Sequence, residues 1–122
     1  MVSYFLRKPK FPLLIETDNR VYGVENEVDL VEIIKRTNHS KKTSYSVVDS
    51  TGEGWSFVPS LTTISPLTVK KKWFKKEIIE LFNSSLKEAK IEKRYIPPNL
   101  SNNTVGKIVN DIVVFDLALT SK

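Results

Sequence analysis

The sequence contains no cysteine, a single histidine and no long apolar run. Without cysteine, disulfides, zinc–thiolate sites, iron–sulfur clusters and thiol nucleophiles are excluded. The one histidine, His39, excludes His-rich metal sites and would have to serve any Ser–His–Asp centre alone. No apolar run approaches the roughly 20 residues that a membrane-spanning helix needs. The N-terminus lacks the charged and apolar regions of a signal peptide, which predicts a cytoplasmic protein.

What is present is the composition of one globular domain. With 40% hydrophobic and 27% charged residues over 122 positions, the chain can bury one core and is too short for two. We therefore predict a single domain over residues 1–122, with its last few residues frayed. The 19 Lys+Arg exceed the 14 Asp+Glu, for a net charge of +5. Most of these cations are lysines, which indicate nucleic acid less strongly than arginines, because only arginine contacts phosphate through two donors.

The predicted strands are arranged as hairpins. Asp18-Asn19 lies between two apolar runs, and both residues tolerate the positive φ that a two-residue hairpin turn requires. A second turn, residues 49–54, contains two glycines. The predicted strands are 3–8, 13–17, 20–24, 44–48 and 55–58, and residues 61–64 could extend the sheet beyond Pro59.

Two segments, 26–36 and 104–119, have the apolar period of amphipathic helices. Asn26 is a good N-cap residue, and acidic residues near it and Lys35-Arg36 at the other end complement the helix dipole. The β-branched residues of 104–119 would favour a hairpin turning at Asn110-Asp111. We predict a helix there, because the apolar positions follow the helical spacing and do not alternate.

A further helix is predicted after Ser65-Pro66, because proline is favoured at the first helical position. Apolar residues then follow the helical period as far as Phe82. Residues 83–85 could break this helix; alternatively, Ser85 and Glu88 form a capping box that begins another.

The resulting order is β-β-β-α-β-β-α-α. Strands that arrive as hairpins pair antiparallel, whereas strand–helix–strand crossovers would give parallel pairs. We predict an α+β fold in which an antiparallel sheet of about five strands is covered by two to four helices on one face.

Residues able to carry catalysis are sparse. Asp49 precedes the glycine-containing turn, and we interpret it as capping that turn through the backbone. His39 lies in a polar link, which indicates an exposed loop residue. The glycines at 52 and 54 lack the Gly-Lys-Ser/Thr ending of a phosphate loop. No metal site and no cofactor are predicted. An enzyme with an unfamiliar site would use Asp49, Glu53 and His39.

A basic stripe is the leading candidate for a binding site. On a helix, Lys71 and Lys75 would be a like-charge pair, and lysines near a helix N-terminus oppose the dipole. Violated local preferences indicate function. Alternatively, the stripe is a solvated face neutralised by acidic residues of the 26–36 helix. The candidate residues are Lys70, Lys71, Lys72, Trp73, Lys75 and Lys76, with Trp55 as a weaker anchor after the turn.

The expected function is that of a small non-catalytic interaction or accessory module whose basic stripe meets an acidic protein surface. A non-specific nucleic-acid binder that uses the same lysines is the alternative. The charge is also divided along the chain: residues 11–34 hold six acidic residues against one Arg, and residues 70–94 hold nine basic against four acidic ones. Such a dipolar molecule could associate with its own copies.

Overall fold

The computed structural model describes residues 2–97 and 99–120 of the chain. The frayed end predicted for the last few residues falls largely on 121–122, which lie outside the described part. In order, the elements are β1 (Ser3–Tyr4), β2 (Leu13–Glu16), β3 (Val21–Val24), α1 (Glu27–Arg36), β4 (Tyr45–Val48), β5 (Gly54–Val58), β6 (Thr63–Pro66), α2 (Lys75–Glu88) and α3 (Val105–Thr120), with short 3-10 turns at Pro59–Leu61 and Leu100–Asn102.

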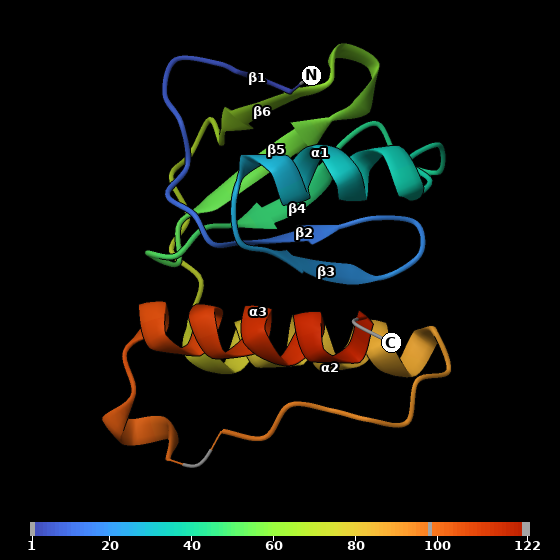
Figure 1. Ribbon diagram of the computed structural model, residues 1–122. Coiled ribbons are helices and arrows are strands. Elements are labelled where there is room, and N and C mark those ends of the chain that lie inside the picture. Colours follow the sequence, from blue (N-terminus) through green and yellow to red (C-terminus); the bar gives the residue numbers. More distant parts are fainter. Residues whose placement is uncertain (1, 98, 121–122) are drawn as a thin grey trace.

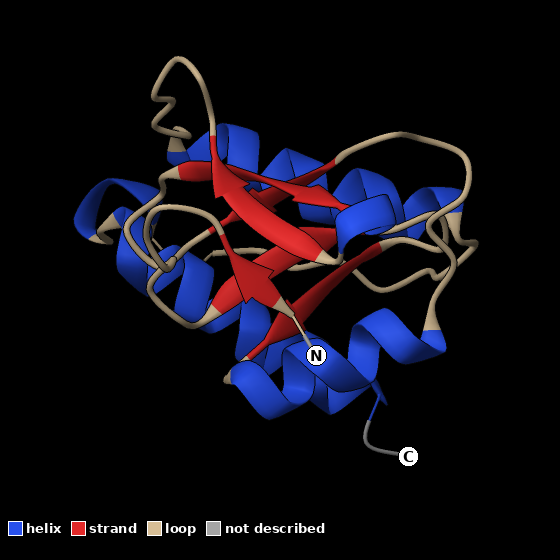
Figure 2. Ribbon diagram, turned by 90° about the horizontal axis from the view of Figure 1, so that it is seen from above, coloured by secondary structure: helices blue, strands red, loops and turns tan. Residues whose placement is uncertain are grey.

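The strands form one mostly antiparallel sheet in the order β1-β6-β5-β4-β2-β3, in which β1 alone pairs parallel, with β6. The α+β class is confirmed. The sheet has six strands within the described residues, because the segment after Pro59 pairs with β5 as a further strand. Seen from above, the strands cross one another at an angle, which is the twist of the sheet (Figure 2).

Helices cover both faces of the sheet, so the prediction of helices on one face is wrong. α1 lies on one side, and α2 and α3 run side by side on the other (Figure 1). Leu13 and Ile15 pack in a core cluster with Leu30 of α1, whereas Leu14 packs with residues of α2 and α3. Successive strand residues point to opposite faces, and all three of these strand residues are fully buried.

The first hairpin is confirmed. The main-chain N–H of Thr17 donates to the carbonyl of Arg20 at 3.1 Å, which leaves Asp18-Asn19 as the two-residue turn. Neither turn residue has positive φ, contrary to the prediction. Instead, Thr17 Oγ1 accepts from the N–H groups of Asn19 and Arg20 at 3.1 and 3.2 Å, which stabilises the turn from its own side chain.

α1 and α3 form as predicted. Asn26 Oδ1 accepts from the N–H of Asp29 at 3.0 Å, as an N-cap does. Residues 105–120 are helical, so the choice of a helix over a hairpin is confirmed. The long periodicity of residues 105–113 therefore outweighs their β-branched composition.

α2 begins later than predicted. Pro66 is the last residue of β6, paired opposite Trp55, and residues 67–74 connect to the helix without helical structure. The helix then runs through residues 83–85 without a break, so neither of the alternatives for that region is correct. Ser85 does not start a helix; its hydroxyl donates to the Phe82 carbonyl and accepts from the N–H of Val21.

Candidate functional site

The basic stripe is an extended segment followed by a helix start. We call residues 69–76 the lysine strap. Its middle is hydrogen-bonded to the turn before β5: the Gly54 N–H donates to the Lys71 carbonyl and the Trp73 N–H donates to the Gly52 carbonyl, each at 2.8 Å. Lys72 stands opposite Glu53 in this short antiparallel pair. The helical like-charge pairs predicted for the stripe therefore do not exist.

The strap lysines have different surroundings. The ammonium of Lys75 donates to the carbonyls of Leu100 and Asn103 at 2.6 and 2.7 Å, which ties α2 to the segment before α3. Lys72 Nζ donates to the Thr51 carbonyl at 3.2 Å. Lys75 is thus a structural residue, and the prediction that it belongs to the binding surface is not supported by its contacts.

The acidic residues of α1 do not neutralise the strap. Glu27 of α1 pairs with Lys8 at 2.6 Å. In the described part of the chain, the strap lysine that forms an ion pair is Lys71, whose ammonium lies 3.8 Å from the carboxylate of Glu77 in α2. Both side chains are about half exposed. A contact that long and exposed contributes little. The alternative in which α1 neutralises the strap lysines is therefore wrong.

Two apolar side chains of the strap face solvent. Val69 is 80% exposed and Phe74 is 73% exposed, and the neighbouring Lys70, Lys71 and Lys76 are exposed as well. Trp73 between them is half-buried and packs closely over Gly54, where an added Cβ would lie 2.9 Å from its indole nitrogen. The packing of Trp73 on Gly54 therefore holds the strap against β5. The ammonium of Lys71 lies 4.4 Å from the centre of the Trp73 ring.

Trp55, the weaker candidate anchor, is not on the surface. It is 2% exposed in the core cluster on the α1 side of the sheet, and its indole N–H donates to Asp49 Oδ2 at 3.0 Å. The Arg7 guanidinium covers the ring at 4.6 Å. The prediction of Trp55 as a partner-binding residue is wrong. Trp55 is the second residue of β5, and its side chain points into the core and not toward solvent.

Asp49 caps the glycine-containing turn, as interpreted from the sequence. Its Oδ1 accepts from the N–H groups of Thr51 and Glu53 at 2.8 and 3.1 Å. The Glu53 side chain is 8% exposed and receives both terminal nitrogens of the Arg7 guanidinium. This hydrogen-bonded pair, with a smaller contribution from Lys70, holds the pKa of Glu53 below its ordinary value of 4.5. The contact joins residues 46 positions apart, so no local sequence signal indicated it.

His39 lies apart from these two carboxylates. Its ring packs edge-on against Tyr45 and Phe57, with centroids 5.9 and 5.4 Å away, and its Nε2 is 2.8 Å from Thr37 Oγ1. The ring is half-buried and not the exposed loop side chain that was expected, and burial lowers the pKa of the imidazole. Asp49 and Glu53 are neighbours, but His39 does not join them. Among the described residues, no cluster of three or more metal-ligating side chains exists.

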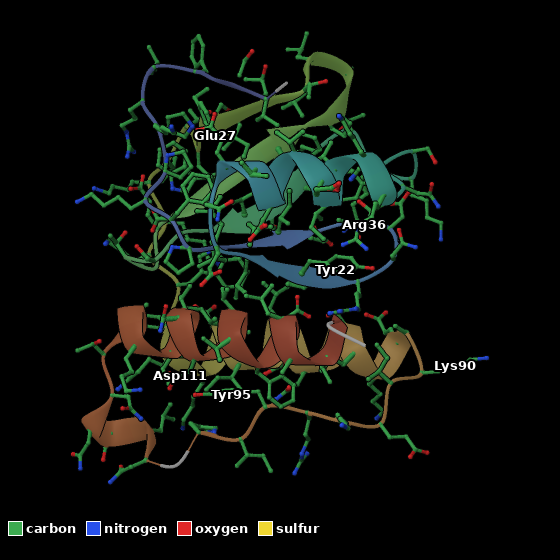
Figure 3. The ribbon with its side chains drawn as sticks, viewed as in Figure 1. Tyr22, Glu27, Arg36, Lys90, Tyr95 and Asp111 are labelled. Atoms are coloured by element: carbon green, nitrogen blue, oxygen red, sulfur yellow. The ribbon has the colours of Figure 1, made fainter. Side chains whose placement is uncertain are left out.

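A second group of cations surrounds a hollow of about 510 Å³ at the end of α2. The N–H of Ile91 donates back to the Leu86 carbonyl at 2.9 Å, and Lys90 adopts a left-handed φ of 62° at this turn. Its side chain points away from the protein (Figure 3). Cations at a helix C-terminus are favoured by the dipole, which gives this group a local structural reason. The cations are Lys87, Lys90, Lys93 and Arg94.

Comparison with known proteins adds the fold and no function. No family model and no curated protein matches the chain. Among solved structures, it is similar to the NMR structure of a protein from Shewanella amazonensis, with a TM-score of 0.60 and 10% sequence identity. The likeness covers 88% of this chain and 90% of that one. In the described part of the chain, none of the helices has the length and apolarity needed to cross a membrane.

Proposed function

We propose that this chain is a non-catalytic interaction module whose lysine strap binds an acidic protein surface. The proposal includes the cytoplasmic location that the sequence predicts. One combination carries it: exposed cations of the strap that make no close ion pair within the described residues, beside the exposed side chains of Val69 and Phe74. Protein interfaces commonly place apolar or aromatic contacts at the centre and charges at the rim.

The chemistry of the strap favours a protein over a nucleic acid. The strap contains no arginine, the residue that makes bidentate phosphate contacts. Of its two exposed apolar residues, Val69 has no ring to stack on a base, and Phe74 is a single aromatic ring where a stacking surface for nucleic acid usually offers several. The lysines would attract an acidic partner and set its orientation, and Phe74 would supply the buried contact.

A second copy of the chain offers one acidic surface of this kind. The first turn of α1 carries Glu27 and Asp29, and α1 lies on the other face of the sheet from α2, the helix in which the strap ends (Figure 1). Head-to-tail association between copies is therefore part of the proposal. Sedimentation velocity at low and high salt tests this part, with salt-sensitive oligomers expected and a monomer at both salt concentrations as the contrary result.

The proposal is tested with two variants of equal charge. K70Q/K71Q/K72Q/K76Q removes the exposed strap cations, and K87Q/K90Q/K93Q/R94Q removes the same charge from the end of α2. Binding of poly-glutamate is measured by calorimetry at several salt concentrations. The strap variant is expected to lose roughly tenfold in affinity, because each exposed ion pair contributes a few tenths of a kcal/mol or more.

The control variant is expected to bind poly-glutamate nearly as well as the unmodified protein. Equal losses in the two variants would mean that net charge binds the polymer, and the proposal would be wrong. Tighter binding to duplex DNA than to poly-glutamate, lost in the strap variant, would favour the nucleic-acid function instead. No loss in the strap variant would exclude the strap as a binding surface.

A further inference from the structure

We infer that the partner segment binds the lysine strap as an extended acidic strand, paired with the main chain at Lys70 and Lys72. This inference rests on the proposed function and adds the form of the ligand. The main-chain hydrogen bonds of the strap use only one of its two edges.

The pairing of Lys72 with Glu53 determines which groups are free. The bonds between the two segments are made by the residues on either side of this pair, Gly54 with Lys71 and Trp73 with Gly52. In such a pair, the N–H and C=O groups of the two central residues point away from each other. On the side away from the strap, the Glu53 N–H donates to the Asp49 carboxylate and the Glu53 carbonyl accepts from the Asp49 N–H.

The N–H and C=O groups of Lys72 accordingly point outward. Within the part of the chain that the structure describes, neither group has a hydrogen-bond partner, and the same is true of the main chain at Lys70. Both residues are exposed. Around Lys72, the strap is thus one side of a short antiparallel pair, and its outer main-chain groups are open.

At the far edge of the main sheet, by contrast, side chains accept from the outward main-chain N–H groups. β3 is its last strand, and the outward N–H groups of Val21 and Gly23 are capped by Ser85 Oγ at 3.0 Å and Asp116 Oδ2 at 2.8 Å. Side chains of α2 and α3 therefore close that edge. An exposed edge is a template for another strand, and proteins usually close such edges in this way.

The charge of the strap determines which strand would fit. Lysines along an edge repel a second strap or any basic strand and pair poorly with an apolar one. An acidic strand gains opposite-charge cross-strand contacts while its main chain completes the hydrogen bonds. Val69 and Phe74 stand at the two ends of the free edge as apolar contacts.

The experiment separates main-chain pairing from charge attraction. The probe is a short synthetic peptide that alternates Glu and Val, and its affinity is measured for Lys72→Pro and Lys72→Ala. Both variants lose the ammonium group, but only proline also removes the outward N–H. This N–H bonds nothing within the described part of the protein, and proline is tolerated on strand edges. A thermal melt checks that each variant is folded.

Lys72→Pro is expected to bind the peptide roughly tenfold more weakly than Lys72→Ala, the cost of one hydrogen bond and its geometry. Backbone N-methylation of the peptide should weaken its binding to the unmodified protein, a test that remains valid if the proline variant does not fold. Equal binding by folded proline and alanine variants, or by methylated and unmethylated peptides, overturns strand pairing. In that case, a loss of poly-glutamate affinity in K70Q/K71Q/K72Q/K76Q would leave the proposed function standing. If that variant kept its affinity, strand pairing and the proposed function would both be wrong.

Discussion

The buried ion pair between Arg20 and Asp116 is expected to hold the β2–β3 hairpin onto α3. Asp116 is 1% exposed, and its Oδ1 accepts from Arg20 Nη1 at 2.6 Å while Oδ2 accepts from the Gly23 N–H at 2.8 Å. The Arg20 guanidinium also donates to the Val21 carbonyl at 2.9 Å and stacks on Tyr22. One carboxylate therefore neutralises a buried charge and closes the sheet edge.

Replacing Asp116 with Ala leaves the buried Arg20 charge without its carboxylate and the Gly23 N–H without its acceptor. Removing one partner of a buried ion pair costs roughly 3–5 kcal/mol of unfolding free energy. Since the urea m-value of a small domain is about 1–3 kcal/mol per M, the unfolding midpoint should fall by roughly 2 M. Glu80→Ala, an exposed change on α2, is the matched control and should shift stability by no more than about 0.5 kcal/mol.

A second substitution distinguishes the uncompensated charge from a simple loss of packing. Adding Arg20→Met to Asp116→Ala removes the buried cation, so the double variant should recover part of the lost stability. If Asp116→Ala costs less than about 1 kcal/mol, a value typical of exposed pairs, the carboxylate does not hold the hairpin.

Three further predictions concern the α2 region and the Arg7 pair. Lys75→Met should cost roughly 2 kcal/mol of unfolding free energy, because the Leu100 and Asn103 carbonyls lose a charged donor, whereas Lys76→Met should change it by less than about 0.5 kcal/mol; equal effects in urea unfolding would contradict this. Lys90→Gly should stabilise the protein by about 0.5–1 kcal/mol, since glycine adopts the left-handed φ without strain, and a lower melting temperature would contradict it. Arg7 holds the pKa of Glu53 below 4.5 in the folded protein, so the stability that Glu53 contributes is present above that pH and is lost as the pH falls. Urea midpoints at a series of pH values should show the advantage of the unmodified protein over Glu53→Gln shrinking below about pH 4.5, and a constant difference would be the contrary result.

The parts of the fold that the sequence predicts well are those decided by neighbouring residues. The cap at Asn26 and the two-residue turn at Asp18-Asn19 depend on contacts within a few positions, and both form. The helix at 105–120 follows from its apolar spacing. The prediction of positive φ at Asp18-Asn19 also failed for a local reason. The Thr17 hydroxyl accepts from the N–H groups of Asn19 and Arg20, which stabilises a turn without positive φ.

The parts that sequence reasoning missed depend on distant partners. Apolar spacing from Val69 to Phe82 suggested one long helix, but the free backbone groups of Gly52 and Gly54 draw residues 71–73 into an extended pair. Three consecutive buried residues, Leu13 to Ile15, were the available signal that both faces of the sheet are covered. The basic character of residues 70–76 was visible in the sequence, but the structural role of Lys75 was not.

The free, positively charged main-chain edge at Lys70 and Lys72 is proposed to receive an acidic strand. An NMR titration of isotope-labelled protein with the alternating Glu/Val peptide tests it most directly, because each main-chain amide reports separately. Shift changes and slowed amide exchange are expected to concentrate at Lys70 and Lys72. Changes centred on residues 87–94, or spread evenly over all exposed lysines, would contradict it.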